Sequence, residues 1–167
     1  MENRHVLSIL VNNNSGVLRR VSSLFARRGY NIESLSVGVT QDPTVSRITV
    51  VAKGDEYIID QIEKQVSKLI DVKKIELLDN DTSVYRELIL IKVKTSRSNR
   101  AEILEIANIF RAHIVDVSPS ALILEATGDS KKLTALLKML EPFTITEIVR
   151  TGLAAVKRGA SRFADEQ

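Results

Sequence analysis

The sequence has 167 residues, 44% of them hydrophobic, and a net charge of +3, which suits one domain or two small ones and excludes a large multidomain enzyme. It has no cysteine and two histidines, which excludes disulfides, iron–sulfur clusters and thiolate zinc sites. No apolar run approaches the roughly 18 residues of a membrane span, and strand-like sequence begins at His5, so we expect a cytoplasmic protein without a leader peptide.

The first half of the chain alternates strand and helix patterns in the order βαββαβ. An apolar run at 6–11 predicts a strand, and turn residues lead from it into a helix over 17–28 that Gly29 ends in a left-handed cap. Alternation at 35–39 and an apolar run at 45–52 predict a hairpin across Asp42-Pro43. A helix begins after Asp55, and a strand at 72–77 closes the unit.

The second half repeats this order after a polar joint at 79–83. Strand patterns lie at 87–94, 114–117, 121–126 and 145–150, and helical stripes lie at 103–110 and 133–140. Asp129 is placed to cap the second of these helices, as Asp55 is in the first half. The predicted fold class is α+β, with two tandem ferredoxin-like βαββαβ units and domains at 1–79 and 80–167.

Two helices on one face of a four-stranded sheet leave the other face uncovered. The first strand is apolar on both sides, since Leu7 and Ile9 alternate with Val6 and Leu10. Because large exposed apolar patches are uncommon on monomers, this pattern favours a homodimer. The alternative is that the two units of one chain cover each other.

Basic residues are mostly interspersed with acidic ones, with two local exceptions. One lies near the C-terminus, where Asp165 and Glu166 follow Arg150, Lys157, Arg158 and Arg162. The other surrounds the first helix of the second half and comprises Arg97, Arg100 and Arg111. Each fits either an anionic partner or an ordinary solvated surface.

The loop at 13–18 has the residues of a small-anion site. Gly16 permits close backbone approach, and the first turn of the following helix offers free N–H groups to a carboxylate. The side-chain carbonyls of Asn13 and Asn14 can accept from an ammonium group, so this loop fits both polar ends of an amino acid. Capping by Asn or Ser with a glycine turn explains the same residues. Asn31 after Gly29 likewise either lines a site or merely finishes the preceding helix.

Residues suited to catalysis are sparse. His5 and His113 have no cysteine or second histidine beside them, and Asp116 has no second carboxylate nearby in the sequence. Ser22 and Ser23 lie within a predicted helix, and glycine motifs for phosphate or dinucleotide binding are absent. The sequence therefore predicts no catalytic residue and no metal site.

Six blocks in a fixed order along nearly the whole chain point to one family. They are Asn13-x-x-Gly16-Val17-Leu18, then GYNIESL at 29–35, DPTVSR at 42–47, RELILIKV at 86–93, FRAHIVDVSP at 110–119 and Arg150-Thr151-Gly152. Together they resemble the small regulatory subunits of acetolactate synthase, also called acetohydroxyacid synthase.

The resemblance implies an N-terminal ACT domain, which is an amino-acid-binding module, followed by a C-terminal domain of related topology. It also implies a homodimer through the ACT domains with L-valine at their interface. Carried over to this chain, the effector-binding residues of one protomer are Asn13, Asn14, Ser15, Gly16, Val17 and Leu18. The opposing protomer would contribute Asn31 and Ile32.

The resemblance further implies a chain that is not catalytic and needs no cofactor of its own. Such a subunit binds the large catalytic subunit, which uses thiamine diphosphate, Mg and FAD in branched-chain amino-acid biosynthesis. It raises the activity of that subunit and confers feedback inhibition by valine. Neither a nucleic acid nor a membrane is an expected partner.

Three other function classes remain open from the residues alone. A tandem RNA-recognition protein shares the topology, but the strands at 45–52 and 121–126 contain no aromatic residue on which a base could stack. A stand-alone ACT-type amino-acid sensor of a different enzyme is the nearer alternative, and co-purification with a large subunit would separate the two. A small enzyme of this fold lacks candidate residues.

Overall fold

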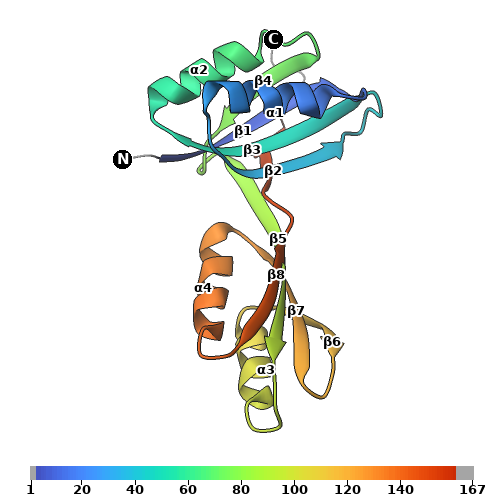
Figure 1. Cartoon of the computed structure of the whole chain (residues 1–167), viewed down its shortest axis with the longest axis vertical. Helices are drawn as coiled ribbons and strands as arrows, with labels where there is room; N and C mark the ends of the chain where they lie inside the picture. The colour runs from blue at the N-terminus through green and yellow to red at the C-terminus, as the bar shows by residue number, and fades with distance from the viewer. Residues whose placement is uncertain (1–2, 161–167) are drawn as a thin grey trace. The chain divides into compact units, whose positions relative to one another are not determined.

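A computed structural model describes residues 3–160, and this part of the chain folds into two units, each with its own sheet and pair of helices (Figure 1). Of the described residues, unit 1 contains 3–85 together with 153–160. Unit 2 is Arg86–Gly152.

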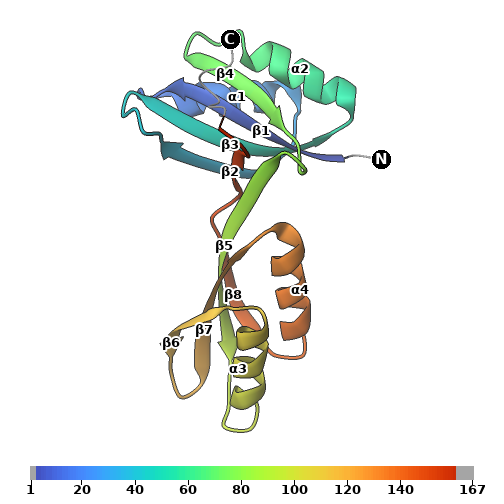
Figure 2. The same cartoon turned by 180° about the vertical axis from the view of Figure 1, so that it is seen from behind.

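Unit 1 is an antiparallel sheet in the order β2-β3-β1-β4 with both helices on one face (Figures 1 and 2). Its elements are β1 (Asn3–Asn12), α1 (Val17–Arg28), β2 (Ile32–Val39), β3 (Val45–Gly54), α2 (Glu56–Val66) and β4 (Val72–Leu78). The core lies between sheet and helices, with Leu7, Ile9, Phe25, Ile48 and Ile62 fully buried. The predicted βαββαβ order is confirmed.

Unit 2 repeats this arrangement, with its central sheet in the order β6-β7-β5-β8. Its elements are β5 (Ser83–Lys94), α3 (Arg100–Ile109), β6 (His113–Val117), β7 (Ala121–Gly128), α4 (Ser130–Leu140) and β8 (Ile145–Arg150). The alternate residues Ile89, Ile91 and Val93 of β5 face its core, as do Leu122 and Leu124 of β7. A tandem ferredoxin-like α+β fold is therefore confirmed.

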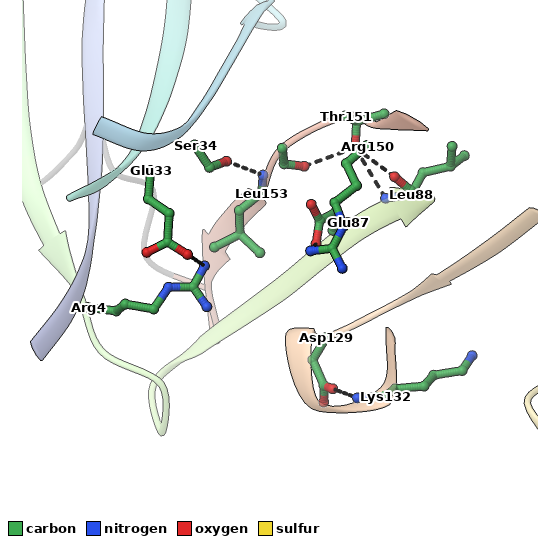
Figure 3. Close-up of polar contacts among 11 residues, drawn as sticks. Arg4, Glu33, Ser34, Glu87, Leu88, Asp129, Lys132, Arg150, Thr151 and Leu153 are labelled. Atoms are coloured by element: carbon green, nitrogen blue, oxygen red, sulfur yellow. Dashed lines mark hydrogen bonds and ion pairs between the residues drawn. The ribbon is translucent and has the colours of Figure 1, made fainter. Parts of the chain in front are cut away.

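The three residues predicted to end or cap helices have these roles in the structure. Gly29 ends α1 at φ 69°, in the left-handed region. The side chain of Asp55 accepts a hydrogen bond from the N–H of Ile58, and Asp129 accepts one from Lys132, each at 2.8 Å (Figure 3 shows the second). These carboxylates also lie at the positive ends of α2 and α4, which stabilises both helices.

The C-terminal segment differs from the sequence expectation. A strand that the sequence did not predict, β9 (Ala154–Lys157), pairs with β5, and β5 itself begins at Ser83 rather than at residue 87. The chain thus returns to unit 1 at Leu153, whereas we expected every residue after 79 in a second domain. A strand of four residues that starts with two alanines offers little periodicity or β-propensity to detect.

This returning segment covers part of the unit 1 sheet on the face opposite the helices. Leu153 and Ala155 are buried there in an apolar cluster with Val6, Val51 and Leu78. The expectation that this face is bare is therefore wrong for this region, because residues of the same chain occupy it.

Polar contacts fix the segment in place along its length. The N–H of Leu153 donates to Ser34 Oγ at 3.1 Å (Figure 3), and Arg47 Nη1 donates to the carbonyl of Ala155 at 3.4 Å. At its far end Lys157 forms an ion pair with Glu76 of β4. The segment is thereby tied to β2, β3 and β4.

We predict that Leu153→Ala destabilises unit 1 by about 2–3 kcal/mol, because it removes a buried side chain and leaves a cavity on the sheet. Val156→Ala on the same strand is the matched control, because Val156 is 51% exposed and Leu153 8% exposed. Chemical denaturation followed by the amide signals of unit 1 would measure both. Equal losses of stability in the two variants would contradict the packing role of Leu153.

Candidate functional site

The loop between β1 and α1 is fixed by Asn13. Its backbone N–H donates to the carbonyl of Thr44 at 2.7 Å, and its Nδ2 donates to the carbonyl of Pro43 at 2.9 Å. Ser46 Oγ in turn donates to Asn13 Oδ1 at 3.0 Å. Asn13 therefore ties this loop to the turn between β2 and β3 and does not cap the helix.

The turn that receives Asn13 is itself well ordered by hydrogen bonds. Asp42 Oδ1 accepts from the N–H of Thr44 at 2.8 Å and from its hydroxyl at 2.7 Å. These two bonds hold the pKa of Asp42 below its ordinary value. The turn thus presents its Pro43 and Thr44 carbonyls to Asn13 in fixed positions.

The first turn of α1 is open to a ligand. Gly16 precedes the helix at φ 84°, a conformation that favours glycine, and no side chain caps the helix. The capping interpretation of this loop is therefore wrong, whereas its glycine turn is confirmed. The N–H of Val17 donates to the carbonyl of Asn14 at 3.4 Å, whereas the N–H groups of Leu18 and Arg19 lack helical acceptors. These two groups lie at the positive end of the helix dipole, which is the geometry that binds a carboxylate.

A charged pair that the sequence analysis missed lies directly behind this turn. Arg20 donates from Nε at 2.7 Å and from Nη2 at 2.6 Å to Asp71 Oδ2, and the Asp71 side chain is largely buried. The carbonyl of Asp71 also accepts from the N–H of Asn12 at 2.9 Å. The pair therefore joins α1 to the end of β1 and to the loop before β4.

Arg20 also faces Gly16. A Cβ atom added at Gly16 would lie 3.4 Å from Arg20 Nη1, the guanidinium nitrogen that does not bond to Asp71. The helix mouth therefore combines backbone N–H groups with a nearby fixed cation, and both favour an anionic group. The sequence offers no local sign of this pair, because its members lie 51 residues apart.

The predicted effector residues of the loop differ in how exposed their side chains are. The side chains of Asn13, Asn14, Ser15 and Leu18 are exposed around the helix mouth. The side chain of Val17 is buried in the unit 1 core, so only its backbone is available to a ligand. Leu18 is thus the aliphatic side chain that this loop presents to a ligand.

Asn31 and Ile32 lie at the opposite end of the sheet. Ile32 pairs with Ala52 on β3, whereas Asn12 at the other end of β1 pairs with Val45. Positions 45 and 52 of a strand are about 23 Å apart. A pocket that uses both sets of residues therefore requires a second chain.

Neither the two histidines, one in each unit, nor the basic residues of unit 2 form a recognisable reactive centre. His5 is partly buried in β1 and His113 is exposed at the start of β6. Arg100 Nη2 donates to the carbonyls of Ser118 and Pro119, each at 2.9 Å, which is a structural role, while Arg97 and Arg111 are exposed. Within residues 3–160, no group of three or more His, Asp and Glu side chains is placed to hold a metal ion.

The C-terminal basic residues are partly engaged in ion pairs. Arg150 pairs with Glu87 at 3.5 Å (Figure 3), and Lys157 pairs with Glu76. Arg158 is exposed. Arg162, Asp165 and Glu166 lie outside the described residues.

The sheet face that RNA-recognition modules use is unsuited to bases in unit 1. The residues of β1 and β3 on the face opposite the helices include Ser8, Thr49 and Val51, all buried, and none is aromatic. Leu153 and Ala155 cover part of this face. These features argue against the RNA-binding alternative.

Among residues 3–160, every helix falls short of the length and apolarity needed to cross a membrane.

Comparisons with known proteins match both units to the same kind of protein. Residues 7–74 match the family model described as the AHAS small subunit-like ACT domain, and residues 86–159 match the model for the small subunit of acetolactate synthase. A probable acetolactate synthase small subunit of Methanothermobacter thermautotrophicus is 49% identical, covering 93% of this chain and 94% of that protein.

Two further relatives extend this similarity. The acetolactate synthase small subunit of Mycolicibacterium smegmatis is 51% identical, over 93% of this chain and 91% of its own length. The crystal structure of the acetolactate synthase small subunit from Thermotoga maritima superimposes with a TM-score of 0.88 at 42% identity, covering 95% of this chain and 99% of that one. The similarity therefore covers both units in sequence and in structure.

We predict that Asp71→Asn costs about 1–3 kcal/mol of stability, because it leaves the Arg20 guanidinium without its anion at a partly buried site. Asp60→Asn is the matched control, since the Asp60–Lys64 pair is an exposed pair on one helix and is worth about 0.5 kcal/mol or less. Denaturant unfolding of both variants would measure the difference. A loss no larger for Asp71→Asn than for Asp60→Asn would refute the role assigned to the Arg20–Asp71 pair.

Proposed function

The chain belongs to the family of acetolactate synthase small subunits, and from this we propose that it is a regulatory subunit that raises the activity of the catalytic large subunit and makes it sensitive to valine. Support comes from the match of both units to the family models and from about 50% identity to small subunits along nearly the whole chain. The chain itself would carry out no chemistry. Thiamine diphosphate, Mg and FAD would reside in the large subunit, in the cytoplasm.

The helix mouth of α1 is the observation that supports an amino-acid effector. Its uncapped N–H groups and the nearby Arg20 guanidinium suit the carboxylate of valine, and Leu18 suits its isopropyl group. The side-chain carbonyl of Asn14, and the lone pair of Asn13 Oδ1 that Ser46 does not use, suit its ammonium group. Asn31 and Ile32 would complete the pocket from the ACT domain of a second protomer, because one chain holds them at the far end of its sheet.

Regulation then follows from the shared interface. A ligand that contacts two ACT domains favours the interface geometry that it binds more tightly, and only this difference in affinity is available to change the catalytic subunit. Homodimerisation through the ACT domains is therefore part of the proposal. A sensor acting on a different enzyme is the remaining alternative, and it would neither bind nor activate an acetolactate synthase large subunit.

We predict that the isolated chain binds L-valine in calorimetric titration and discriminates against D-valine, because the carboxylate, ammonium and isopropyl groups have separate partners in the pocket. Gly16→Asp should weaken L-valine binding at least 10-fold and abolish inhibition of the reconstituted complex while activation persists. The new carboxylate would occupy the anion position beside Arg20.

Gly16→Asn is the control for this substitution. Asn has the shape of Asp without its charge and tolerates the left-handed backbone of Gly16, so most of the L-valine affinity should persist. An equal loss in both variants would show that strain or size, rather than charge, governs the site. Normal L-valine binding by Gly16→Asp would exclude this loop as the carboxylate site.

A further inference from the structure

A groove lined by arginines runs along α1 from the helix mouth, beside Leu69 of the loop before β4. Its lining residues are Gly16, Arg19, Arg20, Ser23, Arg27 and Leu69, and its volume is about 470 Å³. We call this feature the basic groove. Arg19, Ser23 and Arg27 have no part in the effector site described above.

The charges of the basic groove are only partly balanced within the chain. Helix α1 carries four arginines and no acidic residue. Arg20 is paired with Asp71, and Arg28 Nη2 donates to Gln65 Oε1 at 3.0 Å. Within the described residues, the side chains of Arg19 and Arg27 form neither an ion pair nor a hydrogen bond.

The position of Arg19 is unfavourable for the helix itself. It lies in the first turn, at the positive end of the helix dipole, where a cation costs roughly 0.3–1 kcal/mol and an acidic residue would be stabilising. Helix stability therefore does not account for this residue. An anion bound in the groove would offset both the dipole and the repulsion among the arginines.

The length of the groove favours an extended ligand. The eleven residue-to-residue steps from Gly16 to Arg27 span about 16 Å along the helix axis, which is longer than one carboxylate or one phosphate. An extended peptide of about five residues covers the same distance. A peptide with several acidic side chains would meet Arg19, Arg20 and Arg27 in turn.

Apolar residues beside the groove favour a protein ligand over a free polyanion. Leu69 lines the groove, and the next residue, Ile70, is 93% exposed at the tip of the loop before β4. Leu18, next to Arg19, is 41% exposed. A protein segment with both acidic and apolar side chains uses these residues as well as the arginines, whereas an inorganic polyanion uses the arginines alone.

We propose that the basic groove binds an acidic segment of the catalytic large subunit, an inference that rests on the proposed regulatory function. Gly16 belongs to both the groove and the helix mouth. A segment in the groove and an amino acid at the mouth would contact the same helical turn, so each would change the affinity of the other by the same factor.

The test compares two double variants of the full chain in binding to its cognate large subunit. Arg19→Gln with Arg27→Gln removes two groove charges, and Arg97→Gln with Lys131→Gln removes two exposed charges from unit 2. The net charge changes equally, and glutamine keeps helix propensity close to that of arginine. Thermal unfolding of each variant would show that both remain folded.

We expect the groove variant to raise the Kd for the large subunit at least 10-fold and the control variant to change it less than 3-fold. Binding of the unmodified chain should weaken with salt, and this dependence should be shallower for the groove variant, because fewer charges are paired. Equal effects of the two double variants would overturn the groove proposal while leaving the regulatory function intact. Failure of the unmodified chain to bind the large subunit would overturn both.

A second arm uses inorganic tripolyphosphate as a probe, followed by amide chemical shifts of the isolated chain. If tripolyphosphate shifts residues 16–27 and the groove variant still binds the large subunit normally, the groove is a site for free polyanions and the proposal is wrong. Loss of both interactions in the groove variant would support a shared electrostatic surface on which the large-subunit segment competes with tripolyphosphate.

Discussion

The ion pair between Arg20 and Asp71 is the contact on which the arrangement of the candidate site depends. It joins the first turn of α1 to the loop before β4, and the carbonyl of Asp71 extends the connection to the end of β1. Asn13 makes a second connection, from the loop between β1 and α1 to the turn between β2 and β3. An uncapped helix end is thus held from two sides, so its N–H groups keep their direction without a capping side chain.

The order of elements in both units could be predicted from the sequence because it depends on short-range patterns. Alternation in β7, the helical stripe of α4 and the caps at Asp55 and Asp129 are each encoded within a few residues. Strand β9 could not be predicted, because its position depends on a surface formed by Val6, Val51 and Leu78, which are distant in sequence. Long-range packing, rather than local propensity, selects its conformation.

The candidate site shows the same division between local and distant information. The glycine turn and the exposed residues around Gly16 follow from a short motif, but the use of Asn13 as a tether and the pairing of Arg20 do not. Both depend on partners some 30 to 50 positions away. Likewise, periodicity alone would place Val17 in the core, while the family resemblance assigned it to the pocket; the structure buries its side chain.

The chain passes between its units twice, through β5 and again between Gly152 and Leu153, so unit 2 is an insertion within unit 1. This order has a consequence during synthesis. The ribosome supplies all of unit 2 before it supplies Leu153 and Ala155, so nascent unit 1 has helices and sheet but lacks the segment that covers Val6 and Val51. Its apolar surface stays exposed until residues 153–155 have been synthesised, and during this interval chaperones or other nascent chains would meet that surface.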